Sequence, residues 1–125
     1  MKRAIPVLMS LLLCAGVAVA DDLKDASDKV PQLAERLTKL KGAKAGEYAK
    51  TELEAAQTSI GAVKAALAAK NGAQALQKSE LADLQLIMAE AKAAEQESAE
   101  QLVLRRTELR TLEAQFDQLL QTGGK

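Results

Sequence analysis

The 125-residue sequence contains one cysteine, two prolines, no histidine and no tryptophan, and aromatic residues make up 2% of it. Without histidine there is no imidazole base, no usual haem ligand and no zinc site of the common kind. The single cysteine, Cys14, lies in an apolar N-terminal run, so neither a thiolate nucleophile nor a disulfide framework is expected in the rest of the chain. These absences exclude most familiar enzyme classes, and we expect no catalytic residue, cofactor or metal site.

The first 20 residues are typical of a secretory signal peptide. Lys2 and Arg3 form a short basic region, residues 4–17 are almost entirely apolar, and Ala18 and Ala20 are the small residues that signal peptidase recognises. We therefore expect cleavage after Ala20 and a mature periplasmic chain without an integral membrane segment.

Two alternatives to cleavage remain open. A retained membrane anchor would need about 20 apolar residues, which is more than this run supplies. Lipidation at Cys14 would make the chain a lipoprotein, but Leu13 stands where a small residue is needed. Cleavage after Ala20 is favoured over both.

The composition of residues 21–125 favours long helices. Without Lys2 and Arg3, 15 basic residues remain against 17 acidic ones, so electrostatics gives no reason to expect nucleic acid or an anionic membrane as a partner. Alanine supplies about a fifth of these residues. A chain without disulfides and with little aromatic bulk is stabilised by packing, and alanine- and leucine-rich helices pack well along heptad seams.

Apolar residues recur at alternating spacings of three and four in three segments, which predicts three helices with heptad seams. Gly42 and Gly46 mark a break after the first segment, and Lys70-Asn71-Gly72 predicts a sharp reversal after the second. The expected seam residues are Leu33, Leu37 and Leu40 in the first segment, Leu53, Ile60, Val63 and Leu67 in the second, and Leu81, Leu84, Met88, Leu102, Leu109, Leu112 and Phe116 in the third.

The predicted fold class is all-α. We expect a long antiparallel helical hairpin or coiled coil over residues 21–121, its first arm broken between Gly42 and Gly46, followed by a flexible tail at residues 122–125. The last helix, about 48 residues and about 70 Å long, exceeds the second, so the first segment is expected along its distal half. Facing residue numbers should sum to about 143, which places Leu37 near Arg105 and Leu33 near Leu109.

A compact three-helix bundle is the competing arrangement. It would form if the chain reversed at both glycine sites, and it would leave the end of the last helix projecting. Ser27 or Asp28 is expected to cap the first of these helices, because Pro31 would then lie in the first turn, where it forfeits little hydrogen bonding.

The charged clusters are interpreted first as solvated helix faces. Acidic residues on the last helix do not share one face in a metal-binding pattern; they are Asp83, Glu90, Glu95, Glu97 and Glu100. Glu95 and Arg105 are expected at the seam edge, where they set register or meet opposite charges. Lys39, Lys41, Lys44 and Lys50 form the one basic cluster, which is interpreted as a solvated stretch or as a contact with an acidic envelope polymer or lipid headgroup.

Three stretches resemble a bacterial exported family known only as a domain of unknown function. They are the opening Gly46-Glu47-Tyr48-Ala49-Lys50-Thr51-Glu52-Leu53-Glu54-Ala55-Ala56, the turn at residues 65–72, and the alanine-spaced run over residues 80–94. The likeness covers about residues 44–97. It implies an alanine-rich helical hairpin in the cell envelope and no catalytic residue; in other members the hairpin sometimes precedes an OmpA-like domain that binds peptidoglycan.

The C-terminal residue adds a second likeness. Lys125 is similar to the lysine through which the major outer-membrane lipoprotein is joined to peptidoglycan. Peptidoglycan therefore stays among the candidate partners, beside the interpretation of residues 122–125 as a frayed end.

The predicted function is non-enzymatic. We expect a periplasmic helical protein that acts through protein–protein contacts, as an envelope structural or adaptor module or as a homo-oligomer. Apolar side chains outside the seam favour a second hairpin and a four-helix assembly; they are Leu76, Leu86, Ile87, Leu104 and Leu120. The alternative is a periplasmic, ATP-independent holdase chaperone or stress protein.

Overall fold

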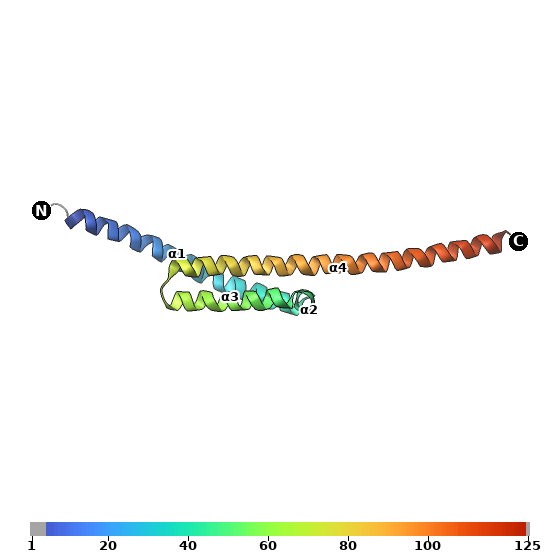
Figure 1. Cartoon of the computed structure of the whole chain (residues 1–125), viewed down its shortest axis with the longest axis horizontal. Helices are drawn as coiled ribbons and strands as arrows, with labels where there is room; N and C mark the ends of the chain where they lie inside the picture. Colours follow the sequence, from blue (N-terminus) through green and yellow to red (C-terminus); the bar gives the residue numbers. More distant parts are fainter. Residues whose placement is uncertain (1–4, 125) are drawn as a thin grey trace.

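The computed structural model describes the backbone of residues 5–124 and the side chains of residues 20–124. Its elements are four α-helices, α1 (Ile5–Gly42), α2 (Ala45–Tyr48), α3 (Lys50–Ala68) and α4 (Gly72–Gly123), shown in Figure 1. The predicted all-α class is confirmed. No helix among the described residues is long and apolar enough to cross a membrane. The signal-peptide features before Ala20 fall on residues whose side chains lie outside the described range, so cleavage after Ala20 remains a prediction.

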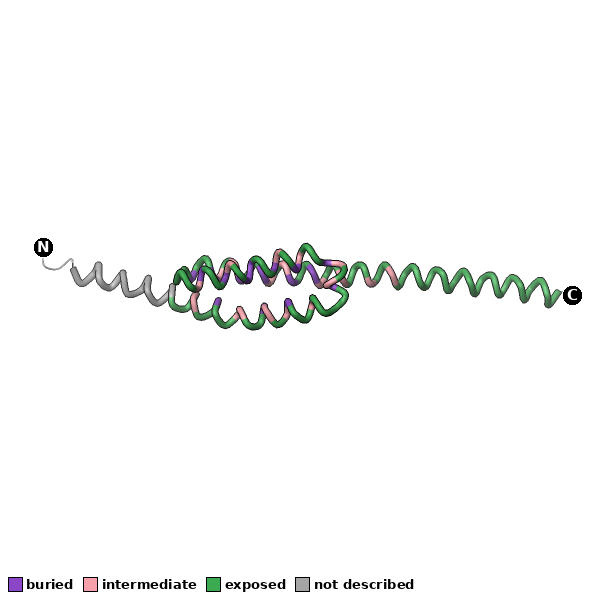
Figure 2. Tube along the Cα trace, turned by 90° about the horizontal axis from the view of Figure 1, so that it is seen from below, coloured by how far each residue is buried: buried purple, intermediate pink, exposed green. Residues whose placement is uncertain are grey.

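Three of these helices form an up-down-up bundle. α1 and α4 run in the same direction, α3, which lies between them in the sequence, runs in the opposite direction, and α2 lies at the first reversal (Figure 1). The C-terminal part of α4 extends well beyond the bundle (Figures 1 and 2). This is the competing arrangement of the sequence analysis, with reversals at both glycine sites and a projecting last helix.

The predicted antiparallel pairing of the second and last helices is confirmed. Ser59 Oγ donates to Gln85 Oε1 at 2.7 Å, and Lys92 Nζ donates to Glu52 Oε1 at 2.8 Å. The residue numbers in each pair sum to 144, close to the expected 143. The Lys92 ammonium lowers the pKa of the Glu52 carboxyl through this hydrogen bond.

The predicted path of the first segment along the distal half of the last helix is wrong. Leu33 and Leu37 pack in one cluster with Ala82 and Leu86, rather than opposite Leu109 and Arg105. The reason is the reversal after α1, which returns the chain so that α1 lies along α3 and the first half of α4.

Gly46 makes this reversal tight. A Cβ atom on Gly46 would lie 2.2 Å from the carbonyl oxygen of Lys41, a distance that real side chains do not tolerate. The turn is closed by backbone hydrogen bonds, among them Gly46 N to Ala43 O at 2.9 Å. Ala45, which directly precedes Gly46, is buried. The absence of a side chain at Gly46 therefore lets α1 and α3 approach at their connection.

The second reversal is a Schellman turn followed by a helix cap. Asn71 N donates to Ala66 O at 2.9 Å and Lys70 N donates to Leu67 O at 3.0 Å, which is the hydrogen-bond pattern of that motif. The left-handed residue is Lys70, with φ of 55°, rather than the asparagine or glycine that follows it. Asn71 instead caps α4 by accepting a hydrogen bond from Gln74 N at 3.2 Å.

The expected helix start at Ser27 or Asp28 is wrong. α1 continues through this region, with Pro31 in its interior. Pro31 is exposed, and so is Ser27, whose carbonyl loses its helical hydrogen bond to the proline ring nitrogen. The defect thus faces solvent, while buried Ala26 and Leu33 hold the opposite face of α1 on the bundle.

The bundle core is built largely from small side chains. Leu33, Leu37, Leu53, Ile60 and Val63 of the expected seams are buried, and Leu40 and Leu67 are partly buried against the core. On α4 the inner face consists of Ala75, Ser79, Ala82, Leu86 and Ala89. Leu86, expected outside the seam, is therefore one of its central residues.

The expected seam of the last helix is wrong. All seven residues predicted there are exposed, by between 40% and 62%: Leu81, Leu84, Met88, Leu102, Leu109, Leu112 and Phe116. α4 carries two apolar stripes, one mostly alanine and one mostly leucine. The small residues let two helices pack closely against α4, so the bundle uses the alanine stripe and leaves the leucine stripe outside.

The two glycines of the first reversal give a matched test. Gly46→Ala should destabilise the protein by about 1–3 kcal/mol, the usual cost of forcing atoms into a packed site. Gly42→Ala should be neutral or stabilise by up to about 1 kcal/mol, because nothing lies within 4 Å of a Cβ there and alanine favours the helix. Urea unfolding followed by circular dichroism measures both, and equal effects would contradict the steric account.

Candidate interaction surface on the last helix

The part of α4 beyond the bundle, residues 101–123, is here called the distal segment. Every residue in it is exposed. At 1.5 Å per residue it is about 35 Å long. In Figure 2 the tube beyond the bundle is coloured as exposed, apart from short intermediate stretches next to the bundle. The distal segment therefore has no intramolecular partner among the described residues.

Large apolar side chains are concentrated on the distal segment. Eight of them are 53–68% exposed: Leu102, Val103, Leu104, Leu109, Leu112, Phe116, Leu119 and Leu120. Fully burying one such side chain stabilises a protein by about 1.5–3 kcal/mol. Monomeric proteins rarely leave apolar surface of this extent in water, and such patches mark interaction sites.

Five of these residues form one heptad stripe. Leu102, Leu109, Leu112, Phe116 and Leu119 follow spacings of seven, three, four and three, and Arg105 occupies the remaining seam position. Toward the bundle the same positions hold Ser98, Glu95 and Ala91, and then the apolar residues Met88, Leu84 and Leu81. Successive residues are rotated by about 100° around the helix axis. Leu84, two residues after buried Ala82, is therefore rotated by about 200° from it and lies on nearly the opposite side of α4. The leucine stripe thus lies on the outside of α4, opposite the core.

The charge on the distal segment is balanced. Residues 101–124 carry three arginines, Arg105, Arg106 and Arg110, and three acidic residues, Glu108, Glu113 and Asp117. Arg105 forms an ion pair with Glu108 at 2.9 Å, three residues along the helix. This neutral surface gives no electrostatic preference for nucleic acid or for anionic lipid.

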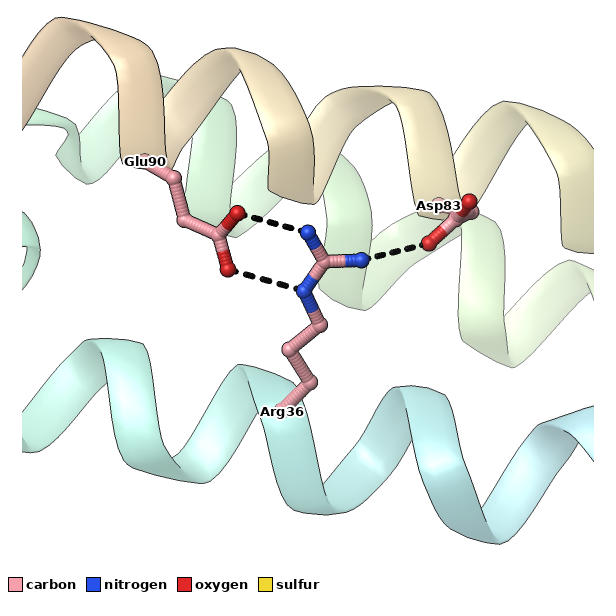
Figure 3. Close-up of polar contacts among 3 residues, drawn as sticks. All are labelled: Arg36, Asp83 and Glu90. Atoms are coloured by element: carbon pink, nitrogen blue, oxygen red, sulfur yellow. Dashed lines mark hydrogen bonds and ion pairs between the residues drawn. The ribbon is translucent and has the colours of Figure 1, made fainter.

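Arg36 holds α1 against α4 through two carboxylates. Its Nε and Nη2 atoms donate to Glu90 at 2.8 and 2.6 Å, and Nη1 donates to Asp83 at 2.6 Å (Figure 3). The side chain of Arg36 is 33% exposed. The guanidinium lowers the pKa of the Glu90 carboxyl, chiefly through the hydrogen bond, and the carboxylates raise the pKa of Arg36.

The interpretation of Asp83 and Glu90 as a merely solvated face is therefore wrong. The overlooked signal is their seven-residue spacing, which places both carboxylates on one side of α4. Arg36, the only arginine between residues 4 and 104, was the missing partner. Its five donors in a planar fork suit two carboxylates at once.

A second polar cluster closes the distal end of the bundle. Lys44 Nζ lies 3.3 Å from Glu97 Oε1 and 3.8 Å from Glu100 Oε2. The hydroxyl of Tyr48 donates to Glu100, and this hydrogen bond raises the pKa of Tyr48 to about 12. These contacts fix the connection between α1 and α3 on α4 immediately before the distal segment begins.

The lysine cluster has partners within the molecule. Besides Lys44, Lys39 lies 3.3 Å from Glu35, and Lys41 donates to Gln57. Three of the four lysines named in the sequence analysis are thus engaged by neighbouring side chains. This leaves less free positive charge for an acidic polymer than the sequence indicated.

A groove of about 400 Å³ lies between α1 and α4. It is lined by Lys29, Gln32, Leu33, Arg36, Glu80, Asp83, Leu84 and Ile87. Its most strongly charged group, Arg36, is already paired with Asp83 and Glu90. Over the described part of the chain, no group of three potential metal ligands comes together. The groove offers packing and ion pairing but no nucleophile activated by a base.

Replacing Arg36 tests how the bundle is held. Arg36→Gln should lower the free energy of unfolding by about 1–2 kcal/mol at pH 7, because it breaks a bidentate pair on a partly exposed surface. The pKa of Glu90 is lowered in the folded protein, so its contribution is present above the ordinary value of 4.5 and is lost as the pH falls below it.

The difference in stability between Arg36→Gln and the parent protein should therefore shrink below about pH 4.5. Chemical unfolding at pH 7 and pH 3 measures it. Lys64→Gln, on the exposed face of α3, is the matched control and should change stability little. A difference independent of pH would contradict the ion-pair account.

Comparison of the chain with protein-family models, curated proteins and solved structures gives no match. The resemblance to the exported family thus stays a prediction.

Proposed function

We propose that the protein is a non-enzymatic periplasmic structural or adaptor module that acts through protein–protein contacts made by the distal segment of α4. The observation that carries this proposal is the leucine-rich stripe of residues 102–119, whose apolar side chains are 53–68% exposed. The periplasmic location rests on the signal-peptide pattern of residues 1–20.

The fold consists of the three-helix bundle and the distal segment of α4 that projects from it. The bundle buries two apolar clusters and joins its helices by ion pairs between α1 and α4 and between α3 and α4. The distal segment adds nothing to that core. In proteins, helices gain most of their stability from packing an apolar face rather than from intrinsic propensity. A partner that covers the stripe supplies that packing.

The spacing of the stripe specifies the kind of partner. Apolar residues at alternating intervals of three and four fit a second helix whose side chains interlock with them. The balanced charges on both flanks suit a partner helix that also carries both signs. A helical segment of a protein is therefore the expected ligand.

Photo-cross-linking in the producing cell tests the proposal. A photoreactive amino acid at Phe116 should give a discrete cross-linked product, because this side chain lies in the stripe. The same amino acid at Lys64, exposed on α3 of the bundle, is the matched control and should give little product. Gel mobility and mass spectrometry of the periplasmic fraction identify the species.

The results of that experiment test the interaction surface and the location separately. A single product from Phe116 supports the adaptor role, and recovery in the periplasm supports the location. Equal labelling at both positions, or no product at Phe116, would overturn the interaction surface. Recovery of the protein with its N-terminal 20 residues in the cytoplasm would overturn the location.

Holdase activity is the second candidate, favoured by one observation. Val103 and Leu104 are exposed outside the stripe, so the apolar surface is wider than one partner helix covers. A holdase would give many cross-linked products from Phe116 and would suppress aggregation of an unfolded client without ATP. A single product with no effect on aggregation eliminates it.

A further inference from the structure

We propose that the distal segments of two copies of this chain pair antiparallel, with facing residue numbers that sum to 221. This inference rests on the proposed function and names its partner as a second copy. It follows from where the apolar and charged residues of the distal segment meet when the helix is laid against itself.

The apolar residues match in this register. Leu102 faces Leu119 of the second copy, and Leu109 faces Leu112 of the second copy, so four leucine pairs form across the twofold axis. Arg105 faces Phe116 of the second copy. An arginine over an aromatic ring is a favourable contact, so the one charged seam residue acquires a suitable partner.

The flanking charges match as well. In an antiparallel coiled coil, a residue that flanks the seam contacts a residue at the same heptad position on the other helix. Arg106 then lies beside Glu113 of the second copy, and the twofold axis repeats this contact. On the other flank Glu108 lies beside Gln115, which is neutral. Opposite charges thus meet twice on one flank, once on each side of the twofold axis, and no like charges meet on the other flank.

Other arrangements place like charges together. A parallel pair in register sets Arg105 against Arg105 in the seam and Glu108 beside Glu113 on the flank. An antiparallel pair shifted by one heptad toward the bundle sets Arg106 against Arg106 and Glu108 against Glu108. A shift the other way sets Glu113 against Glu113. The sum of 221 is the register among these that avoids every such clash.

The length of the distal segment fits this pairing. Gln101 faces Leu120 of the second copy, so the overlap covers the distal segment and stops where Glu97 and Glu100 contact Lys44. The paired region spans about three heptads, enough for a coiled-coil seam. The first segment of the same chain does not compete, because α1 is packed in the bundle.

Disulfide cross-linking tests the direction of pairing. In a Cys14→Ser background, Leu102→Cys and Leu119→Cys are made separately. A mixture of the two variants should form a covalent dimer on mild oxidation, because these residues face each other. Either variant alone should not, because the two copies of residue 102 are about 25 Å apart along the axis. Dimers from each single variant would overturn the antiparallel arrangement.

Charge exchange tests the register. By analytical ultracentrifugation, Arg106→Glu and Glu113→Arg should each raise the dimer dissociation constant by roughly tenfold, because each creates two like-charge contacts. The double variant restores opposite charges and should return the constant to that of the parent protein. An unchanged constant in Arg106→Glu, or no restoration in the double variant, would overturn the register.

The same ultracentrifugation separates this inference from the proposed function. A monomer of the parent protein at high micromolar concentration would overturn self-pairing alone. The proposed function would then still stand if Phe116 cross-links to a different protein. Absence of any product at Phe116 would overturn both, and a product with the mass of two chains would support both.

Discussion

The rest of the structure depends on the alanine-rich inner face of α4. Ala75, Ala82 and Ala89 are fully buried, and their small side chains let α1 and α3 pack on one side of the same helix. Larger residues on this face would hold the two helices apart. The bundle therefore buries mostly small residues of α4 and leaves the leucines on the opposite face exposed.

This division explains why a short bundle carries a long extension. The inner face becomes polar after Ala93, where Glu97 and Glu100 take over and pair with Lys44 and Tyr48. Among the described residues no other helix packs on α4 beyond that point, and the helix continues with its outer stripe alone. The ion pairs of Arg36 and Lys92 align α1 and α3 on α4, and the extension is a continuation of that same helix.

Much of the fold could be predicted from the sequence, because heptad spacing and glycine positions are local signals. The helical class, the reversal at residues 70–72 and the pairing of α3 with α4 follow from them. The two glycines also locate the break after α1, but that the chain reverses there was expected only in the competing arrangement. The face of α4 that packs in the bundle could not be predicted in this way. Leu84 is more apolar than Ala82, and a seam is usually sought among leucines. The choice depends on how close the neighbouring helices come, which is a tertiary property. Arg36 was missed for the same reason, because its carboxylates lie on another helix.

The central claim is that the leucine stripe of the distal segment is an interface. Hydrogen–deuterium exchange of the purified protein at low and high concentration tests it most directly. The account predicts that amides of residues 101–123 exchange quickly in dilute solution and become protected on concentration, while those of α3 stay unchanged. Rapid exchange of residues 101–123 at every concentration, with or without the cross-linked partner, would contradict it.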